Sequence, residues 1–250
     1  MRFISKLRAP PLNTHYDGDY SEEAMRWRRV GGADKAANIA SLLGDSQVES
    51  VLEVGCGTGC VLAELRQRGI GSTFVGVDMA DPGAHRDPSA DGMTLLDYDG
   101  EKLPFEDDSF DLVYASHVLE HVQDERGFIR ELARVSRKLL YIEVPCELTI
   151  RASQSALQQS LNIGHINSYT PLSFAMTLET TDAEPIRFEV FSHSGAMAVF
   201  HAKSGLAWLK GWSKEILRRL MLKGPWKSLA PSIFVYHCGA LCRPRGRANG

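Results

Sequence analysis

The stretch at residues 51–59, VLEVGCGTG, constrains the fold of this 250-residue chain more than any other. Its first four residues are mostly apolar and fit a short buried strand. A helical pattern of apolar residues begins at Cys60, and Gly69 suits the end of that helix. Because glycine adopts positive φ without steric cost, a glycine-dense turn between strand and helix lets the backbone approach a ligand closely. The glycines occupy alternate positions, at Gly55, Gly57 and Gly59.

The glycine spacing separates two classes of cofactor site. Dinucleotide-binding turns read G-x-G-x-x-G. This turn reads G-x-G-x-G, and an acidic residue, Glu53, stands two positions before its first glycine. A turn that binds phosphate has no use for a carboxylate there, so the residues favour a cofactor with a cationic group.

The next predicted strand, at residues 73–77, ends in Asp78. Asp78 follows Gly59 by 19 residues. This is close to the offset of roughly 20 residues at which an acidic side chain accepts hydrogen bonds from ribose hydroxyls. Asp78 is therefore a candidate ribose ligand.

Apolar runs that alternate with helical patterns predict a single α/β domain. The first predicted helix extends from Ser21 to Leu43 and can break at Gly31-Gly32, and prolines restrict the crossover at 80–92 to a short or distorted helix. Further helices are expected at residues 60–68, 124–139, 171–178 and 205–223. Strands are expected at residues 51–54, 73–77, 93–96, 110–115, 140–144, 186–193 and 233–241.

A second motif-rich stretch follows the third strand. It contains Asp97, then L-P-F at 103–105, D-x-F-D-x-V at 108–113 and H-V-L-E-H at 117–121. With the glycine turn, these motifs closely resemble the class I S-adenosylmethionine-dependent methyltransferases, specifically their small-molecule, type 11-like group. The resemblance covers roughly residues 30–145. It implies a Rossmann-like, doubly wound seven-stranded sheet, mostly parallel with the last strand antiparallel, and helices on both faces.

The resemblance also implies which residues bind S-adenosylmethionine. The glycine turn would hold the methionine part and Glu53 would support its ammonium group. Asp78 would bind the ribose hydroxyls, and Asp97 the adenine amino group. The complete set implied for the cofactor is Glu53, Gly55, Cys56, Gly57, Gly59, Asp78, Met79, Asp97, Tyr98, Ser116 and His117.

Two further histidines are candidates for catalysis, as a general base or as substrate ligands. His121 ends the second motif-rich stretch, and His165 lies in a G-H-I-N run at 164–167. That run, followed by Y-T-P, resembles a segment of many bacterial methyltransferases of this group. The alternative for His165 is a structural role at the cap of the helix that begins at Pro171. The ordinary histidine pKa of about 6.5 suits either chemical role.

No metal site is expected from the sequence. His117 and His121 match the H-x-x-E-H order of some metalloproteases. However, His117 falls at a strand-to-helix junction, and no third ligand follows at a recognisable spacing. An odd number of cysteines argues against a disulfide framework, and we interpret them as small buried hydrophobic residues. They are Cys56, Cys60, Cys146, Cys238 and Cys242.

Two other functions stay open at this point. A nicotinamide dehydrogenase would share the strand, turn and helix, but the glycine spacing differs. A catalytically inactive methyltransferase-like binding protein would keep the fold and lose cofactor motifs. Here the glycine turn, Asp78 and Asp97 are intact.

Several classes of methyl acceptor are excluded because the sequence lacks the features that they require. The formal net charge of −3 gives no case for nucleic acid. The fourth strand ends in Y-A-S-H rather than D/N-P-P-Y/F, which argues against amino-directed nucleic-acid and glutamine methyltransferases. We expect a small molecule, a sugar precursor or a lipid-linked acceptor, methylated at oxygen.

No apolar run approaches the roughly 20 residues of a membrane span, so we expect a cytoplasmic protein. The sequence does not indicate the oligomeric state.

We divide the chain into an N-terminal arm or lid (1–29), a methyltransferase domain (30–242) with a substrate-side insertion (146–170), and a basic tail (243–250). The arm, with Tyr16 and Tyr20, and the insertion are expected to close over the site from two sides. The helix at 205–223 has a basic face that suits either an anionic surface or plain solvation.

Overall fold

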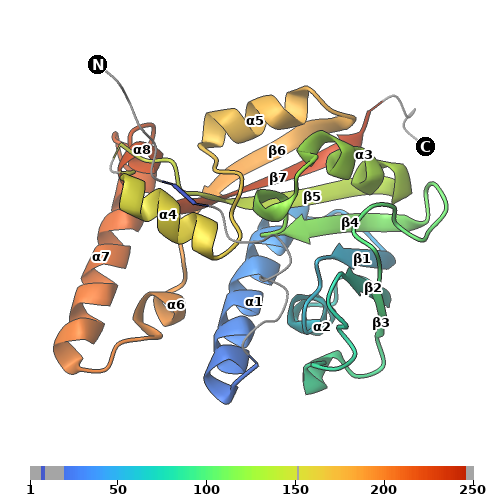
Figure 1. Ribbon diagram of the computed structural model, residues 1–250, viewed down its shortest axis with the longest axis horizontal. Coiled ribbons are helices and arrows are strands. Elements are labelled where there is room, and N and C mark those ends of the chain that lie inside the picture. Colours follow the sequence, from blue (N-terminus) through green and yellow to red (C-terminus); the bar gives the residue numbers. More distant parts are fainter. Residues whose placement is uncertain (1–6, 9–19, 151, 246–250) are drawn as a thin grey trace.

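The computed structural model describes residues 7–8, 20–150 and 152–245, which fold around one central sheet (Figure 1). Within this part of the chain, seven strands lie in the order β3-β2-β1-β4-β5-β7-β6. Only β7 runs against its neighbours, since it pairs antiparallel with both β5 and β6. The predicted Rossmann-like sheet is confirmed. The strands are β1 (Ser50–Val54), β2 (Thr73–Asp78), β3 (Thr94–Asp97), β4 (Phe110–Ser116), β5 (Ser136–Cys146), β6 (Ala183–Phe191) and β7 (Tyr236–Pro244).

Helices cover both faces of the sheet (Figure 1). One core lies under α1 and α2, and the other lies under α3 and α5. The central strand β4 is buried along its whole length, as expected for a parallel strand between two helical layers. The helices are α1 (Glu22–Leu43), α2 (Cys60–Gln67), α3 (Glu125–Val135), α4 (Gln154–Asn162), α5 (Pro171–Glu179), α6 (Gly195–Val199), α7 (Gly205–Lys223) and α8 (Ala230–Ile233), with short 3₁₀ turns η2 (Pro88–Ala90) and η3 (Leu119–His121). No helix in the described ranges is both long enough and apolar enough to cross a membrane.

Helix α1 is unbroken, unlike the predicted helix that could break at Gly31-Gly32. Its N-cap is Ser21, whose hydroxyl accepts from the Ala24 amide at 3.3 Å. A Cβ on Gly32 would lie 2.9 Å from Cys60 Sγ, so this glycine lets α1 pack closely against α2. The helix also crosses the predicted boundary between arm and domain at 29/30.

The junction between α3 and β5 lies earlier than predicted. Helix α3 ends at Val135, and β5 begins at Ser136 rather than at 140. A helix at 124–139 would place Arg137 and Lys138 near its C-terminus, where basic side chains are favourable. Instead, their side chains pair with buried Asp111 at 2.7 and 3.3 Å, which holds this segment in the sheet.

The end of the chain also differs from the prediction. Strand β6 begins at Ala183 and β7 extends to Pro244, so Arg243 belongs to the sheet rather than to a basic tail. Arg245 donates to the carbonyls of Thr181 and Ala183 at 3.1 and 3.4 Å. Arg247 lies outside the described residues.

Candidate cofactor and acceptor site

The glycine turn joins β1 to α2 at the carboxyl edge of the sheet. All three of its glycines have positive φ, at +79° for Gly55, +50° for Gly57 and +78° for Gly59. A Cβ on Gly55 would strike Val118 at 2.3 Å, and one on Gly59 would lie 2.9 Å from Ala90. A Cβ on Gly57 would meet nothing within 4 Å. Two glycines therefore serve packing, and Gly57 leaves its backbone open to a ligand.

Asp78 is held directly on this turn. Its Oδ2 accepts from the Gly57 amide at 2.7 Å, and its Oδ1 accepts from the Ala80 amide at 3.1 Å. Asp97 is the register partner of Asp78 across the β2–β3 pair, and the Tyr98 amide donates to the Asp78 carbonyl. The residues predicted for ribose and adenine thus lie together at two adjacent strand ends. Met79, which follows Asp78, is exposed.

Glu53 occupies a buried position on β1, just before the turn. Its side chain is 3% exposed, and Oε2 has no hydrogen-bond partner among the described residues. Burial raises the pKa of this carboxyl to about 8. Cys56 is also buried, and burial raises the pKa of its thiol. A buried carboxylate oxygen without a partner, beside an open glycine turn, fits a cofactor with a cationic amino group.

Ser116 and His117 end β4 at the same edge. His117 has φ of +61°, an uncommon backbone conformation for a residue with a side chain. Its Nε2 lies 3.3 Å from Glu143 Oε1 and 2.8 Å from His237 Nδ1. His237 Nε2 in turn lies 3.0 Å from His193 Nδ1. Burial lowers the pKa of His117 and of His237 well below the usual range, so both imidazoles are neutral.

The other two predicted histidines meet beside this network. The rings of His121 and His165 pack edge to face, with centroids 4.8 Å apart. His121 Nδ1 lies 3.0 Å from the Gly164 carbonyl, and His165 Nδ1 lies 3.0 Å from Glu147 Oε2. Burial opposes a charge on His165, but Glu147 and Glu120 outweigh it and raise the pKa of the imidazole.

Glu120 lies in the middle of this group. Its side chain is 1% exposed, and neither carboxylate oxygen has a hydrogen-bond partner among the described residues. His117 Nδ1 lies 3.5 Å from its Oε1. Burial raises the pKa of the Glu120 carboxyl to about 7. Sequence reasoning assigned Glu120 no role, although it lies inside the H-V-L-E-H motif.

The G-H-I-N run is fixed onto η3 through its backbone. The amides of Ile166 and Asn167 donate to the Glu120 carbonyl at 2.9 and 3.0 Å. His165 does not cap α5, because the Thr170 side chain forms the N-cap. The predicted structural alternative for His165 is therefore wrong.

The predicted lid segments lie partly outside the described residues. The segment at 146–170 leaves the carboxyl end of β5 and contains α4. Tyr20 stacks on His85, in the connection after β2, with ring centroids 3.5 Å apart. Tyr16 is outside the described residues. Closure of the two segments over the site stays a prediction.

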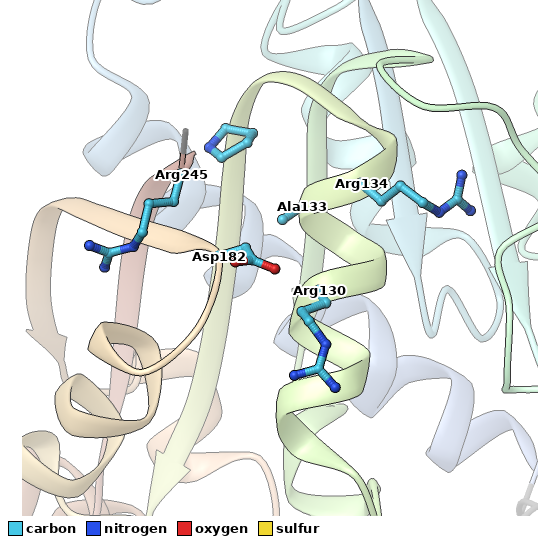
Figure 2. Close-up of a pocket in the computed structure, with 6 residues that line it drawn as sticks. Arg130, Ala133, Arg134, Asp182 and Arg245 are labelled. Atoms are coloured by element: carbon cyan, nitrogen blue, oxygen red, sulfur yellow. The ribbon is translucent and has the colours of Figure 1, made fainter. Parts of the chain in front are cut away.

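A separate hollow lies at the opposite edge of the sheet. It is lined by Arg130, Ala133, Arg134, Asp182, Pro244 and Arg245, around the end of α3 and the start of β6. In Figure 2 the guanidinium groups of Arg134 and Arg245 point away from each other. Arg134 is bound to Glu131 and Arg245 to backbone carbonyls, so this hollow is not an anion site built from converging arginines.

Comparisons with known proteins agree with this geometry. A family model described as a methyltransferase domain matches residues 52–139. Malonyl-(acyl-carrier protein) O-methyltransferase of Salmonella typhimurium is 29% identical over 177 residues, which make up 69% of this chain and 68% of that protein. Tocopherol O-methyltransferase of Arabidopsis thaliana is 28% identical over 149 residues, which make up 56% of this chain and 42% of that protein.

A solved structure shows the same fold at low identity. The structure of geranyl diphosphate C-methyltransferase from Streptomyces coelicolor A3(2), with Mg²⁺, geranyl diphosphate and S-adenosyl-L-homocysteine, superposes with a TM-score of 0.62. Identity is 13%, and the match covers 97% of this chain and 91% of that one.

Sheet order, glycine turn and strand-end carboxylates together define a Rossmann-like methyltransferase fold. The matched domain, the similar methyltransferases and the fold support a class I S-adenosylmethionine-dependent methyltransferase, whose cofactor is S-adenosylmethionine. The matched domain, residues 52–139, contains the glycine turn, Asp78 and the H-V-L-E-H motif.

Proposed function

We propose that this chain transfers a methyl group to an oxygen atom of a small-molecule acceptor, which binds at the carboxyl ends of β4 and β5. The observation that carries this proposal is the convergence of Glu120, His121 and His165 beside the glycine turn. Gly55 packs directly against Val118, and Val118 lies one residue before η3. The open turn and the polar group are therefore neighbours in space.

The chain's own residues have three tasks in this reaction. S-adenosylmethionine supplies a methyl group on a sulfonium, which an in-line displacement transfers. The open backbone at Gly57, the carboxylate of Asp78 and the buried Glu53 would hold the cofactor. His121 and His165 would contact the acceptor oxygen and orient it, because alignment of the reacting atoms supplies much of the rate in such reactions.

Local hydrogen bonds prepare the two histidines for this role. His165 Nδ1 donates to Glu147 Oε2 at 3.0 Å, which fixes the orientation of its ring. His121 Nδ1 lies 3.0 Å from the Gly164 carbonyl, which fixes the second ring. Two oriented imidazoles that touch edge to face suit a single acceptor hydroxyl between them and the cofactor.

The names of two relatives support oxygen as the acceptor atom, since both are called O-methyltransferases. The rest of each name, malonyl-acyl-carrier protein in one and tocopherol in the other, describes a different acceptor. The acceptor of this chain is accordingly proposed only as a class, which includes small metabolites, sugar precursors and lipid-linked compounds.

Product formation from a panel of such acceptors tests the proposal. S-adenosylhomocysteine release should appear with a hydroxyl acceptor. His165→Ala should lower kcat by at least about 100-fold, the scale of a lost acid–base or orienting group, and leave the affinity for S-adenosylhomocysteine within about twofold. His201→Ala is the control, because His201 is exposed and pairs with Glu23 away from the site.

Two results would contradict the proposal. Methylation at nitrogen or carbon would refute the oxygen assignment. Tight cofactor binding without turnover of any acceptor would support a catalytically inactive methyltransferase-like binding protein instead.

A further inference from the structure

We infer that Glu120, His121 and His165 form a binding site for a divalent transition metal ion, of which Zn²⁺ is the simplest example. One ligand atom from each residue lies within 4.8 Å of the other two. Tetrahedral Zn²⁺ with bonds of about 2.0–2.1 Å has its ligand atoms roughly 3.4 Å apart. The side chains therefore need to close in by little more than 1 Å, a shift within reach of rotamer adjustment.

The histidines have the outer hydrogen bonds that metal ligands need. A metal-bound histidine usually donates its second ring N–H to a carboxylate or a backbone carbonyl. His165 Nδ1 has Glu147 as this partner, and His121 Nδ1 has the Gly164 carbonyl. Because these contacts occupy Nδ1 of each ring, Nε2 is the atom that would bind the metal.

Glu120 supplies the independent argument. An ionised carboxylate buried without a partner costs several kcal/mol, and protonation would leave a buried hydroxyl in need of an acceptor. Two other buried carboxylates, Glu143 and Asp111, have partners. Glu143 Oε2 accepts from Tyr141 and from Asn38, and Asp111 binds arginine and lysine. A cation is the partner that the Glu120 carboxylate lacks among the described residues.

The ligand set also indicates the chemistry. Two imidazole nitrogens and one carboxylate oxygen suit Zn²⁺ or Fe²⁺ and leave at least one coordination position open. If the proposed function holds, His121 and His165 orient the acceptor oxygen through the ion rather than by direct contact. The oxygen then binds at the open position, because a Lewis acid lowers the pKa of a bound hydroxyl. The binding of the metal itself does not depend on that function.

A second polar group provides a matched control. His117, Glu143 and His237 also place ligand atoms within 4.8 Å of one another. Their atoms already satisfy each other, with His117 Nε2 and His237 Nδ1 only 2.8 Å apart, the distance of an ordinary hydrogen bond. This group needs no ion.

The test titrates untagged, chelator-treated protein with Zn²⁺ by calorimetry and with Co²⁺ by visible absorption. We expect one ion per chain. Glu120→Gln should weaken binding by at least about 100-fold, the upper end for lost metal-site contacts, and His237→Gln should change it less than about threefold. Thermal unfolding and S-adenosylhomocysteine binding should show that Glu120→Gln still folds.

Three outcomes would overturn the metal site: no stoichiometric ion in the parent protein, equal affinity in Glu120→Gln, or loss of the ion only in His237→Gln. Methylation by a chain that binds no metal would refute the metal site and leave the proposed function standing. Metal binding by a chain that methylates no acceptor would refute the proposed function and leave the metal site standing.

A different observation carries a second inference: we propose that the outer face of α7 docks on an anionic lipid surface. Only one side chain of this 19-residue helix, Glu215, is buried. That side faces the protein, where Gly211 approaches the Ala198 carbonyl and the Arg218 carbonyl accepts from Tyr236. Figure 1 shows α7 extending away from the sheet beside α6.

The opposite side of α7 presents an apolar stripe. Leu206, Leu209 and Leu220 are 64%, 59% and 63% exposed, and Ile216 and Leu217 are exposed on the same side. Their spacing of three and four residues places them on one helical face. An exposed apolar stripe of this length on a basic helix is typical of segments that lie in a membrane interface.

The basic charge of α7 indicates an anionic partner for its exposed face. Besides the buried Glu215, the charged residues of α7 are all basic. Arg218 and Arg219 pair with Glu215 at 3.5 and 3.3 Å, whereas Lys210, Lys214 and Lys223 are exposed. The whole chain has a formal net charge of −3, so the basic face is local to this helix. A second copy would bring an equally basic face, whereas an anionic bilayer attracts basic side chains near its surface.

Vesicle sedimentation tests this inference with phosphatidylglycerol-containing and pure phosphatidylcholine vesicles. Binding should require the anionic lipid and weaken with salt. Leu209→Glu combined with Leu220→Glu should reduce binding at least about tenfold, since it removes two leucines that would be buried in the bilayer. Leu172→Glu is the control, because Leu172 is 83% exposed on α5.

Absence of binding to anionic vesicles would overturn the proposal. A concentration-dependent dimer that the double variant abolishes would assign the face to a second copy instead.

Discussion

Asp111, at the amino edge of the sheet, and Glu53 and Glu120, at its carboxyl edge, are buried carboxylates with opposite surroundings. At the amino edge, Asp111 is 2% exposed and accepts from the Glu49 amide at 2.9 Å. It also binds Arg137 and Lys138 at 2.7 and 3.3 Å. At the carboxyl edge, Glu53 and Glu120 are just as buried, yet they have oxygens without a hydrogen-bond partner in the described part of the chain.

The pKa values follow the same division. Burial alone would raise the pKa of Asp111, but its amide, arginine and lysine partners hold it below the usual value. Burial dominates at Glu53 and raises its pKa to about 8. A buried carboxylate with protein partners stabilises the fold, whereas one without them is poised for a ligand that brings positive charge.

The largest expected effect tests the open turn. Gly57→Val should abolish S-adenosylhomocysteine binding, a loss of at least about 1000-fold, because a branched side chain would fill the space that the ligand approaches. Gly69→Val is the matched control, since Gly69 also has positive φ and open space but lies at the end of α2. Calorimetry should show binding only in the control, and both variants should lose similar stability. Retained binding in Gly57→Val would place the cofactor elsewhere.

Asp111→Ala tests the partnered carboxylate. It should lower the free energy of unfolding by about 1–3 kcal/mol, because it leaves the Glu49 amide without its acceptor and the half-exposed Arg137 and Lys138 without their counter-charge. Cofactor affinity should stay within about twofold. Since the folded pKa of Asp111 is lowered, its contribution is present above the unfolded value near 3.8 and is lost as pH falls through the folded pKa. Urea titrations from pH 7 to pH 3 should show this loss in the parent protein only; equal acid sensitivity in the variant would contradict it.

Glu53→Gln should have opposite effects on binding and on stability. Loss of the charge should weaken cofactor binding by about 10- to 100-fold, the size of a charge-assisted hydrogen bond. The raised pKa of Glu53 makes its ionisation unfavourable in the folded, cofactor-free protein, a penalty that grows from pH 4.5 towards pH 8. The variant should therefore melt at a higher temperature than the parent at pH 8 and at nearly the same temperature at pH 4.5. A lower melting temperature at pH 8 would mean that Glu53 has a stabilising partner.

The smallest expected effect lies at the amino edge. Arg134 binds both carboxylate oxygens of Glu131 at 2.9 Å, and this pair is partly exposed. Glu131→Gln should cost about 1 kcal/mol and leave cofactor binding unchanged. Denaturant titration measures this cost. A loss as large as that of Asp111→Ala would show that burial does not distinguish the two carboxylates.

Much of the cofactor site could be predicted from the sequence because its parts are local. The glycine turn follows its strand directly, and Asp78 ends the next strand, so chain connectivity alone brings them to one edge of a parallel sheet. The G-H-I-N run was recognisable as a motif, although its contact with Glu120 was not. The start of β5 was misplaced because Arg137 and Lys138 suit a helix end as well as they suit Asp111.

The sequence by itself determined the class of fold, the cofactor turn and the positions of His121 and His165. Only the tertiary structure decided which side chains surround them. His117 and His237 are 120 residues apart and meet because β7 inserts antiparallel beside β5. Glu147 finds His165 because the segment between them folds back over the strand end. Whether a buried carboxylate has a partner depends on such long-range pairings, and no local pattern of residue types carries that information.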